Sequence, residues 1–190
     1  MKLEREFERI KLNHRKALKA TAARVVLGPS VVRVFQKGTK NRLMPVLARI
    51  DIEGLSRRKN QQQFKLWFEK QLDKVSVAVR KANRANSRIY PGYKWGHSTK
   101  ILTLYIREMI LNSRFFNDSQ VRRISKWLYT PIDGIAIKRL RKLGVKLPFK
   151  NIKEIRTSEM FYWIQDILGE AAKEAGAPRV WFDDNWGDRQ

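Results

Sequence analysis

Two residues of this chain, a lysine and an aspartate, have types and surroundings that suit catalysis. Lys100 follows the small polar residues Ser98 and Thr99 and precedes the most apolar stretch of the sequence, ILTLYIREMIL at 101–111. A lysine in the first turn of a buried helix lies beside the positive end of the helix and close to the core, and both effects disfavour its ammonium form. The position therefore favours a nucleophilic amine, although a basic residue there could simply contact a phosphate.

The aspartate is Asp133, within Thr130-Pro131-Ile132-Asp133-Gly134. This segment predicts a carboxylate at a helix start, directly after a turn fixed by proline. Backbone N–H groups of the first helical turn would keep the carboxylate ionised. The same residue could serve only as an ordinary N-cap, so the spacing by itself leaves both roles open.

Helical patterns surround these two residues and predict an all-α protein. The clearest is at 60–86, where Phe64, Phe68, Leu72, Val75 and Val79 recur at steps of three and four and form one helical face. Further helices are expected at 3–27, at 101–111, from a cap at Asp118 or Ser119 to about Tyr129, from Asp133 to Leu143 before Gly144, and from a cap at Thr157 or Ser158 to Gly176. Residues 30–58 are the least predictable and could contain a short helix or a strand. We expect one compact helical unit over 1–190, with an N-terminal part at 1–58 and a core at 60–190.

The charge indicates a polyanionic partner. The 190 residues include 41 Lys+Arg against 18 Asp+Glu, a formal net charge of +23. Solubility alone needs a charge of only about 2–8. Basic residues occur in nearly every segment, whereas a membrane-surface protein would concentrate them in a separate amphipathic helix. We therefore expect a nucleic-acid binder, with double-stranded DNA as its partner.

Other classes of site and location are disfavoured by what the sequence lacks. It has no cysteine, and its two histidines, His14 and His97, are far apart, so no metal or other cofactor is expected. No apolar run approaches the length of about 20 residues that spans a bilayer, and the N-terminal residues lack the apolar core of a signal peptide. We expect a monomer in the cytoplasm, associated with the nucleoid.

The two candidate residues and their flanks resemble the helix–hairpin–helix DNA glycosylase superfamily. Gly96-His97-Ser98-Thr99-Lys100 is similar to the hairpin that leads into a buried helix bearing the catalytic lysine, and Pro131-Ile132-Asp133 is similar to the segment that supplies the invariant aspartate. The spacing looks closest to the archaeal 8-oxoguanine glycosylases, whose hairpin is atypical. The resemblance covers roughly residues 88–145. It implies a helical glycosylase-like fold.

The resemblance also implies a mechanism. The target nucleotide would be flipped out of the duplex into a pocket. Asp133 would stabilise positive charge on the sugar, and Lys100 would attack C1′ to form a Schiff base, with associated AP-lyase activity. If water is the nucleophile, Lys100 would only position a phosphate. The excised base would be 8-oxoguanine or a hypermodified, for example glucosylated, cytosine of phage DNA, in repair or in antiviral defence.

Further residues are expected to bind the DNA and the flipped base. The DNA-binding set comprises Lys94, Gly96, His97, Ser98, Lys138, Arg139, Arg141 and Lys142, and the base-pocket set comprises Trp95, Asp183, Asp184 and Trp186. Each has a simpler interpretation: a solvated helix face for the cations, core packing for the rings and a solvated C-terminal segment for the acids.

A second hypothesis is a non-catalytic basic protein that coats DNA or RNA. The geometry that distinguishes it is simple, because only an enzyme requires Lys100 Nζ and Asp133 to converge at the mouth of one cavity.

Overall fold

The computed structural model describes residues 2–35, 37–83 and 94–182, and these residues are arranged as helices and loops without any β-strand. The prediction of an all-α protein is confirmed at this level. The longer helices are α1 (Lys2–Val26), α3 (Thr39–Ala48), α4 (Gln61–Asn83), α5 (Thr99–Arg107), α6 (Asp118–Ser125), α7 (Gly134–Lys142) and α8 (Ser158–Glu174). The short ones are α2 (Pro29–Val32), the 3-10 helices η1 (Ile52–Arg57) and η5 (Ile152–Glu154), and the π-helical turns η3 (Lys94–Ser98) and η4 (Glu108–Asn112).

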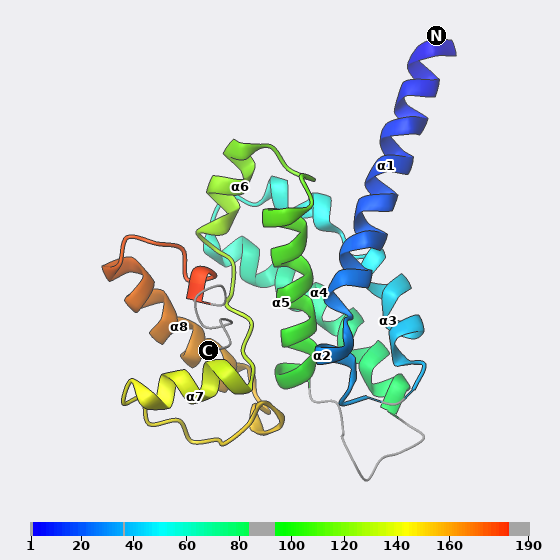
Figure 1. The fold of residues 1–190 in the computed structure, drawn as a ribbon. Helices are drawn as coiled ribbons and strands as arrows, with labels where there is room; N and C mark the ends of the chain where they lie inside the picture. Colours follow the sequence, from blue (N-terminus) through cyan, green and yellow to red (C-terminus); the bar gives the residue numbers. More distant parts are fainter. Residues whose placement is uncertain (1, 36, 84–93, 183–190) are drawn as a thin grey trace.

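Helix α5 lies in the middle of the molecule, as its apolar sequence predicts. Ile101, Leu102, Tyr105 and Ile106 are all buried, and the helix contacts both α1 and α4. Figure 1 shows α5 between α1 and α8, with α4 passing behind it. The predicted single run at 101–111 is two segments, because α5 passes into the π-helical turn η4 at Glu108.

Helix α4 confirms the amphipathic pattern predicted from the sequence. The five predicted core positions, Phe64, Phe68, Leu72, Val75 and Val79, have no exposed surface, whereas Leu66 on the opposite face is 59% exposed. Phe64 and Phe68 meet Tyr129, with ring centroids 5.1 and 4.9 Å away. This aromatic packing joins α4 to the segment that leads toward Asp133.

The N-terminal helix has two halves with different environments. Residues 3–17 are exposed, and Figure 1 shows this part of α1 projecting from the body of the protein. Ala22, Ala23 and Val26 are buried in the core. Phe7 and Ile10, in the projecting half, are 57% and 54% exposed, so the predicted helix at 3–27 is present but only its C-terminal part contributes to the core.

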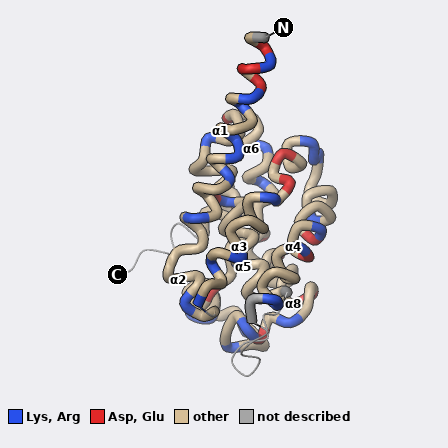
Figure 2. Tube along the Cα trace, turned by 90° about the vertical axis from the view of Figure 1, so that its right-hand side faces the viewer, with Lys and Arg blue, Asp and Glu red and all other residues tan. Residues whose placement is uncertain are grey.

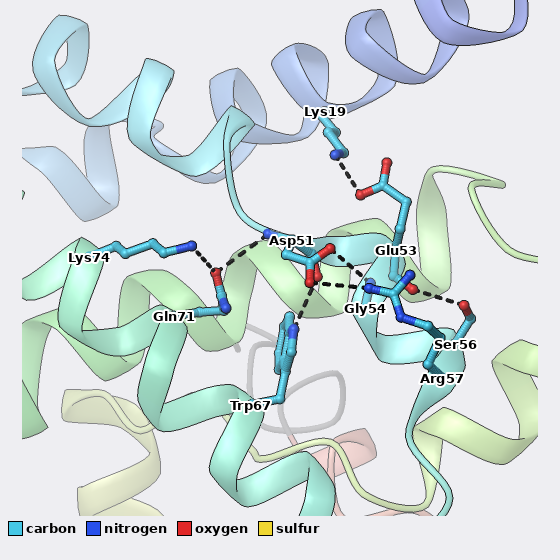
Figure 3. Close-up of polar contacts among 9 residues, drawn as sticks. All are labelled: Lys19, Asp51, Glu53, Gly54, Ser56, Arg57, Trp67, Gln71 and Lys74. Carbon is cyan, nitrogen blue, oxygen red and sulfur yellow. Dashed lines mark hydrogen bonds and ion pairs between the residues drawn. The ribbon is translucent and has the colours of Figure 1, made fainter.

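The segment after α3 connects the N-terminal part to α4 through a polar cluster around Asp51 (Figure 3). The Asp51 carboxylate accepts from the Gly54 N–H at 3.1 Å and caps η1, while Trp67 Nε1 donates to the Asp51 carbonyl at 3.0 Å. Lys19 of α1 forms a 2.7 Å ion pair with Glu53 of η1. The described part of 30–58 thus contains α3 and the shorter α2 and η1 and no strand, and these residues share the core with α4 rather than forming a separate layer.

The helix caps agree only in part with the sequence prediction. Thr157 caps α8, and Gly144 and Gly176, with φ of +85° and +64°, follow α7 and α8. The cap of α6 is neither Asp118 nor Ser119 but Asn117, whose side chain accepts from the Gln120 N–H in a reciprocal capping box. That helix also ends at Ser125 rather than near Tyr129, because residues 126–127 form a turn and the chain then runs without helical structure to α7.

Candidate active site

The structure brings Lys100 and Asp133 together. Lys100 lies in the first turn of α5, Asp133 is the N-cap of α7, and Lys100 Nζ is 3.3 Å from Asp133 Oδ2. Their side chains are 20% and 28% exposed, so the pair is partly enclosed yet can be reached from solvent. The geometry required by the enzyme hypothesis is therefore present.

Asp133 uses its two oxygens for different purposes. Oδ1 accepts from the N–H groups of Ile135 and Ala136 at 2.9 and 3.0 Å, which caps α7, and Oδ2 receives Lys100. The N-cap interpretation and the interpretation as a partner of Lys100 are thus both correct. Because Oδ1 is held by two backbone amides, the orientation of Oδ2 toward Lys100 is fixed by the start of α7.

The segment that carries Asp133 is held in place from α8 and its C-terminal neighbour. Gln165 pairs with both backbone groups of the fully buried Thr130, accepting from its N–H and donating to its carbonyl at 2.9 Å each. The Arg179 guanidinium donates to the carbonyls of Trp127 and Leu128 at 3.0 and 2.9 Å. We call these two residues the Gln165–Arg179 clamp. It satisfies the backbone of an extended buried segment and so positions Asp133.

A cavity of about 140 Å³ opens beside the ion pair. Lys100, Asp133, His97 and Gly134 line one part of it. The remaining lining residues are Ser30, Val31, Arg33, Val34 and Phe35 from α2 and the residues after it, with Ile101 and Ile152. The sequence analysis missed the contribution of 30–35. The spacing of Val31, Val34 and Phe35 indicates an apolar helical face, but nothing in it indicates which helix that face would meet.

His97 is buried at 6% exposure next to this cavity. Burial, followed by the nearby charges of Lys100 and Lys153, lowers the pKa of His97 to about 4. Its imidazole is therefore neutral near pH 7. The ring meets that of Phe35 edge-on, with centroids 5.6 Å apart.

The predicted phosphate-binding hairpin is a helical turn instead. Gly96, His97 and Ser98 belong to η3, which runs directly into α5, and all three are buried, so their contact with phosphates stays a prediction. A Cβ on Gly96 would lie 2.4 Å from the Ile152 carbonyl oxygen, so this glycine allows close backbone packing against η5. Lys94 begins η3, and its side chain lies outside the described residues.

The basic residues of α7 lie on its exposed face. Ala136, Ile137 and Leu140 face the core, while the cations between them, Lys138, Arg139, Arg141 and Lys142, are exposed. Arg141 also donates to the Phe149 carbonyl at 2.5 Å. Figure 2 shows that basic residues are spread along the whole trace. The α7 group differs from the others because it lies on the helix that begins at Asp133.

Of the four predicted base-pocket residues, Trp95 is the one that the structure describes. Trp95 packs against Phe161 and Tyr162, with ring centroids 5.9 and 5.6 Å away, and does not line the cavity beside Lys100, so its simpler interpretation as a packing residue is correct. Asp183, Asp184 and Trp186 lie outside the described residues. Among the residues described, none of the helices is both long and apolar enough to cross a bilayer, and no group of three or more His, Asp or Glu side chains could hold a metal ion.

Comparisons of this chain with protein-family models, with curated proteins and with solved structures found no match.

Proposed function

We propose that this protein is a DNA glycosylase that excises a base from double-stranded DNA. The observation that carries the proposal is the Lys100–Asp133 pair, 3.3 Å apart at the edge of a cavity. An amine and a carboxylate in contact can together cleave an N-glycosidic bond, the amine by attack on the sugar and the carboxylate by stabilising its positive charge. The π-helical turn η3 directly before Lys100 supports the proposal, since such turns are frequent at functional sites.

The residues then have distinct roles. The net charge of +23 attracts DNA, and the exposed cations of α7 grip the phosphates next to the reacting nucleotide. The nucleotide turns out of the helix toward the cavity. Asp133 stabilises the sugar cation as the bond to the base breaks. Lys100 passes one ammonium proton to the departing base, and its amine bonds to C1′ as the bond between C1′ and the base breaks. Transfer of a second proton from the nitrogen to O4′ then opens the sugar ring and leaves a protonated Schiff base that permits strand cleavage.

Borohydride trapping tests this mechanism. Only an amine forms a Schiff base that borohydride reduces to a stable protein–DNA adduct, so the wild-type protein should be trapped on its substrate and Lys100→Gln should lose both adduct and strand cleavage. Lys173→Gln on α8, where the side chain is 80% exposed, is the matched control and should behave as wild type. If bases are released by both wild type and Lys100→Gln without any adduct, water is the nucleophile and Lys100 has a positioning role.

Asp133→Asn tests the carboxylate separately. The amide keeps the shape and a side-chain oxygen for the cap but removes the charge that stabilises the sugar cation. Base release should be lost while DNA binding stays the same or tightens. Full activity of this variant would mean that Asp133 is only a helix cap and that the glycosylase proposal is wrong.

A non-catalytic DNA-binding or RNA-binding protein is the second candidate. It is favoured by the fact that Asp133 already has a structural role in capping α7, which would explain its position without any reaction. This candidate is supported if neither base release nor an adduct occurs on any DNA from phage and host sources of differing modification, while salt-dependent binding persists.

A further inference from the structure

The cavity beside Lys100 and Asp133 has a size that selects among bases. We propose that it takes a single-ring base, a pyrimidine, and excludes purines; this inference rests on the proposed glycosylase function. The cavity measures about 140 Å³. An engineered apolar cavity of about 150 Å³ holds one benzene molecule, so one six-membered ring with small substituents matches the available space. A purine has a second fused ring and needs correspondingly more room.

The walls suit a flat ring. Val31 and Ile101 are almost fully buried, and together with Val34 and Ile152 they line the cavity with aliphatic groups. Phe35 adds an aromatic ring, held edge-on against His97. Aliphatic and aromatic surfaces of this kind replace the stacking that a base loses when it leaves the duplex.

Polar groups also lie at the cavity. His97 lines it as a neutral imidazole, because burial lowers its pKa. Gly134, the first residue of α7, lies at the lining, and the N–H groups of a first helical turn are not accepted by carbonyls of the helix itself. A donor there would stabilise the negative charge that develops on the O2 oxygen of the pyrimidine as the base departs.

The volume also limits the substituents. The cavity of about 140 Å³ has no room for the sugar of a glucosylated cytosine in addition to the pyrimidine ring. Such a base could bind only with the ring inside the cavity and the sugar outside it. The selectivity set by the cavity therefore concerns the ring, and we infer that 8-oxoguanine is not the substrate.

The test compares duplexes that differ at a single position. The full-length protein is incubated with duplexes that contain uracil or 5-hydroxymethylcytosine, and with matched duplexes that contain 8-oxoguanine or hypoxanthine, and released bases are measured by mass spectrometry. We expect release of the pyrimidines to be faster by about 10-fold or more. Preferential release of a purine overturns the size inference and leaves the glycosylase proposal intact. If no base is released and borohydride traps no adduct, both are overturned.

Two variants show whether the cavity itself sets the selectivity. A Cβ on Gly134 has no neighbour within 4 Å, so Gly134→Val can fold without a clash while it narrows the cavity. We expect its rate of pyrimidine release to fall by about 10-fold or more with DNA binding unchanged.

Phe35→Ala, which widens the cavity, should raise the ratio of the purine release rate to the pyrimidine release rate by a similar factor. Leu143→Ala, 70% exposed at the far end of α7, is the control and should match wild type. Wild-type rates and selectivity in both Gly134→Val and Phe35→Ala would place the base elsewhere and overturn the inference.

Discussion

Acid should destabilise this protein through His97. Burial lowers the pKa of this histidine from 6.5 to about 4. Between these two values the unfolded chain binds a proton that the folded chain does not, so the free energy of unfolding falls as the pH falls from 6.5 toward 4. One pKa unit corresponds to about 1.4 kcal/mol, so the full effect is about 3 kcal/mol, of which about 2 kcal/mol is lost by pH 5. Above about pH 7.5 the histidine contributes almost no pH dependence.

His97→Gln removes the titrating group and should remove this part of the acid sensitivity. The measurement is urea unfolding at about pH 7 and about pH 5, where most carboxylates are still ionised. Between these two conditions the free energy of unfolding should fall by about 2 kcal/mol more in the wild type than in the variant, whatever the stability of the variant at about pH 7. His14→Gln, on the exposed part of α1, is the matched control and should behave as the wild type.

Equal losses for wild type and His97→Gln, within about 0.5 kcal/mol, would refute the reasoning. They would mean that the folded protein accepts a proton at His97 as readily as the unfolded chain. The burial of His97 beneath Phe35 and its proximity to Lys100 would then have no electrostatic consequence, and a neutral imidazole at the cavity could not be assumed.

Three further outcomes are expected. If about 6–10 phosphates are contacted, the affinity for DNA should fall by about 10³–10⁵ between 50 and 200 mM salt in a binding titration. An affinity that does not change with salt would exclude phosphate contacts as the source of the binding. In denaturation, Asp133→Ala should be less stable than Asp133→Asn by about 1 kcal/mol, because only asparagine can still cap α7; equal stabilities would show that the cap is unimportant. Gln165→Ala leaves both backbone groups of Thr130 buried and unpaired and should cost about 2–5 kcal/mol, whereas Glu170→Ala, exposed on the same helix, should cost less than about 0.5 kcal/mol.

The parts of the structure that follow from local rules could be predicted. The spacing of apolar residues located α4, and the apolar run at 101–111 located the buried helix. The start of α7 was equally clear, because Asp133 after a proline is a capping pattern that depends only on its neighbours. Lys100 and Asp133 could be predicted as candidate site residues for the same reason, since each lies at the start of a helix whose position the sequence already indicates.

The remaining features depend on tertiary packing. No periodicity distinguishes the buried half of α1 from residues 3–17, because a partner helix, rather than propensity, decides which half is covered. The cavity wall at 30–35 is formed only when α2 meets the start of α5. The misassigned cap of α6 is different, because Asn117 and Gln120 already have the spacing of a capping box and could have been identified from the sequence.

The contact between Gly96 and η5 has a consequence for evolution. Any side chain at position 96 would collide with the Ile152 carbonyl oxygen, so drift at this site is restricted by the backbone of a distant segment. Descendants of this chain should therefore retain glycine at 96 whatever they bind. A persistent glycine shortly before a lysine is easily interpreted as the mark of a phosphate-binding hairpin. In this chain the glycine would instead persist because its backbone packs against η5. A substitution at 96 would be tolerated only in lineages in which the η5 segment around Ile152 had first moved away.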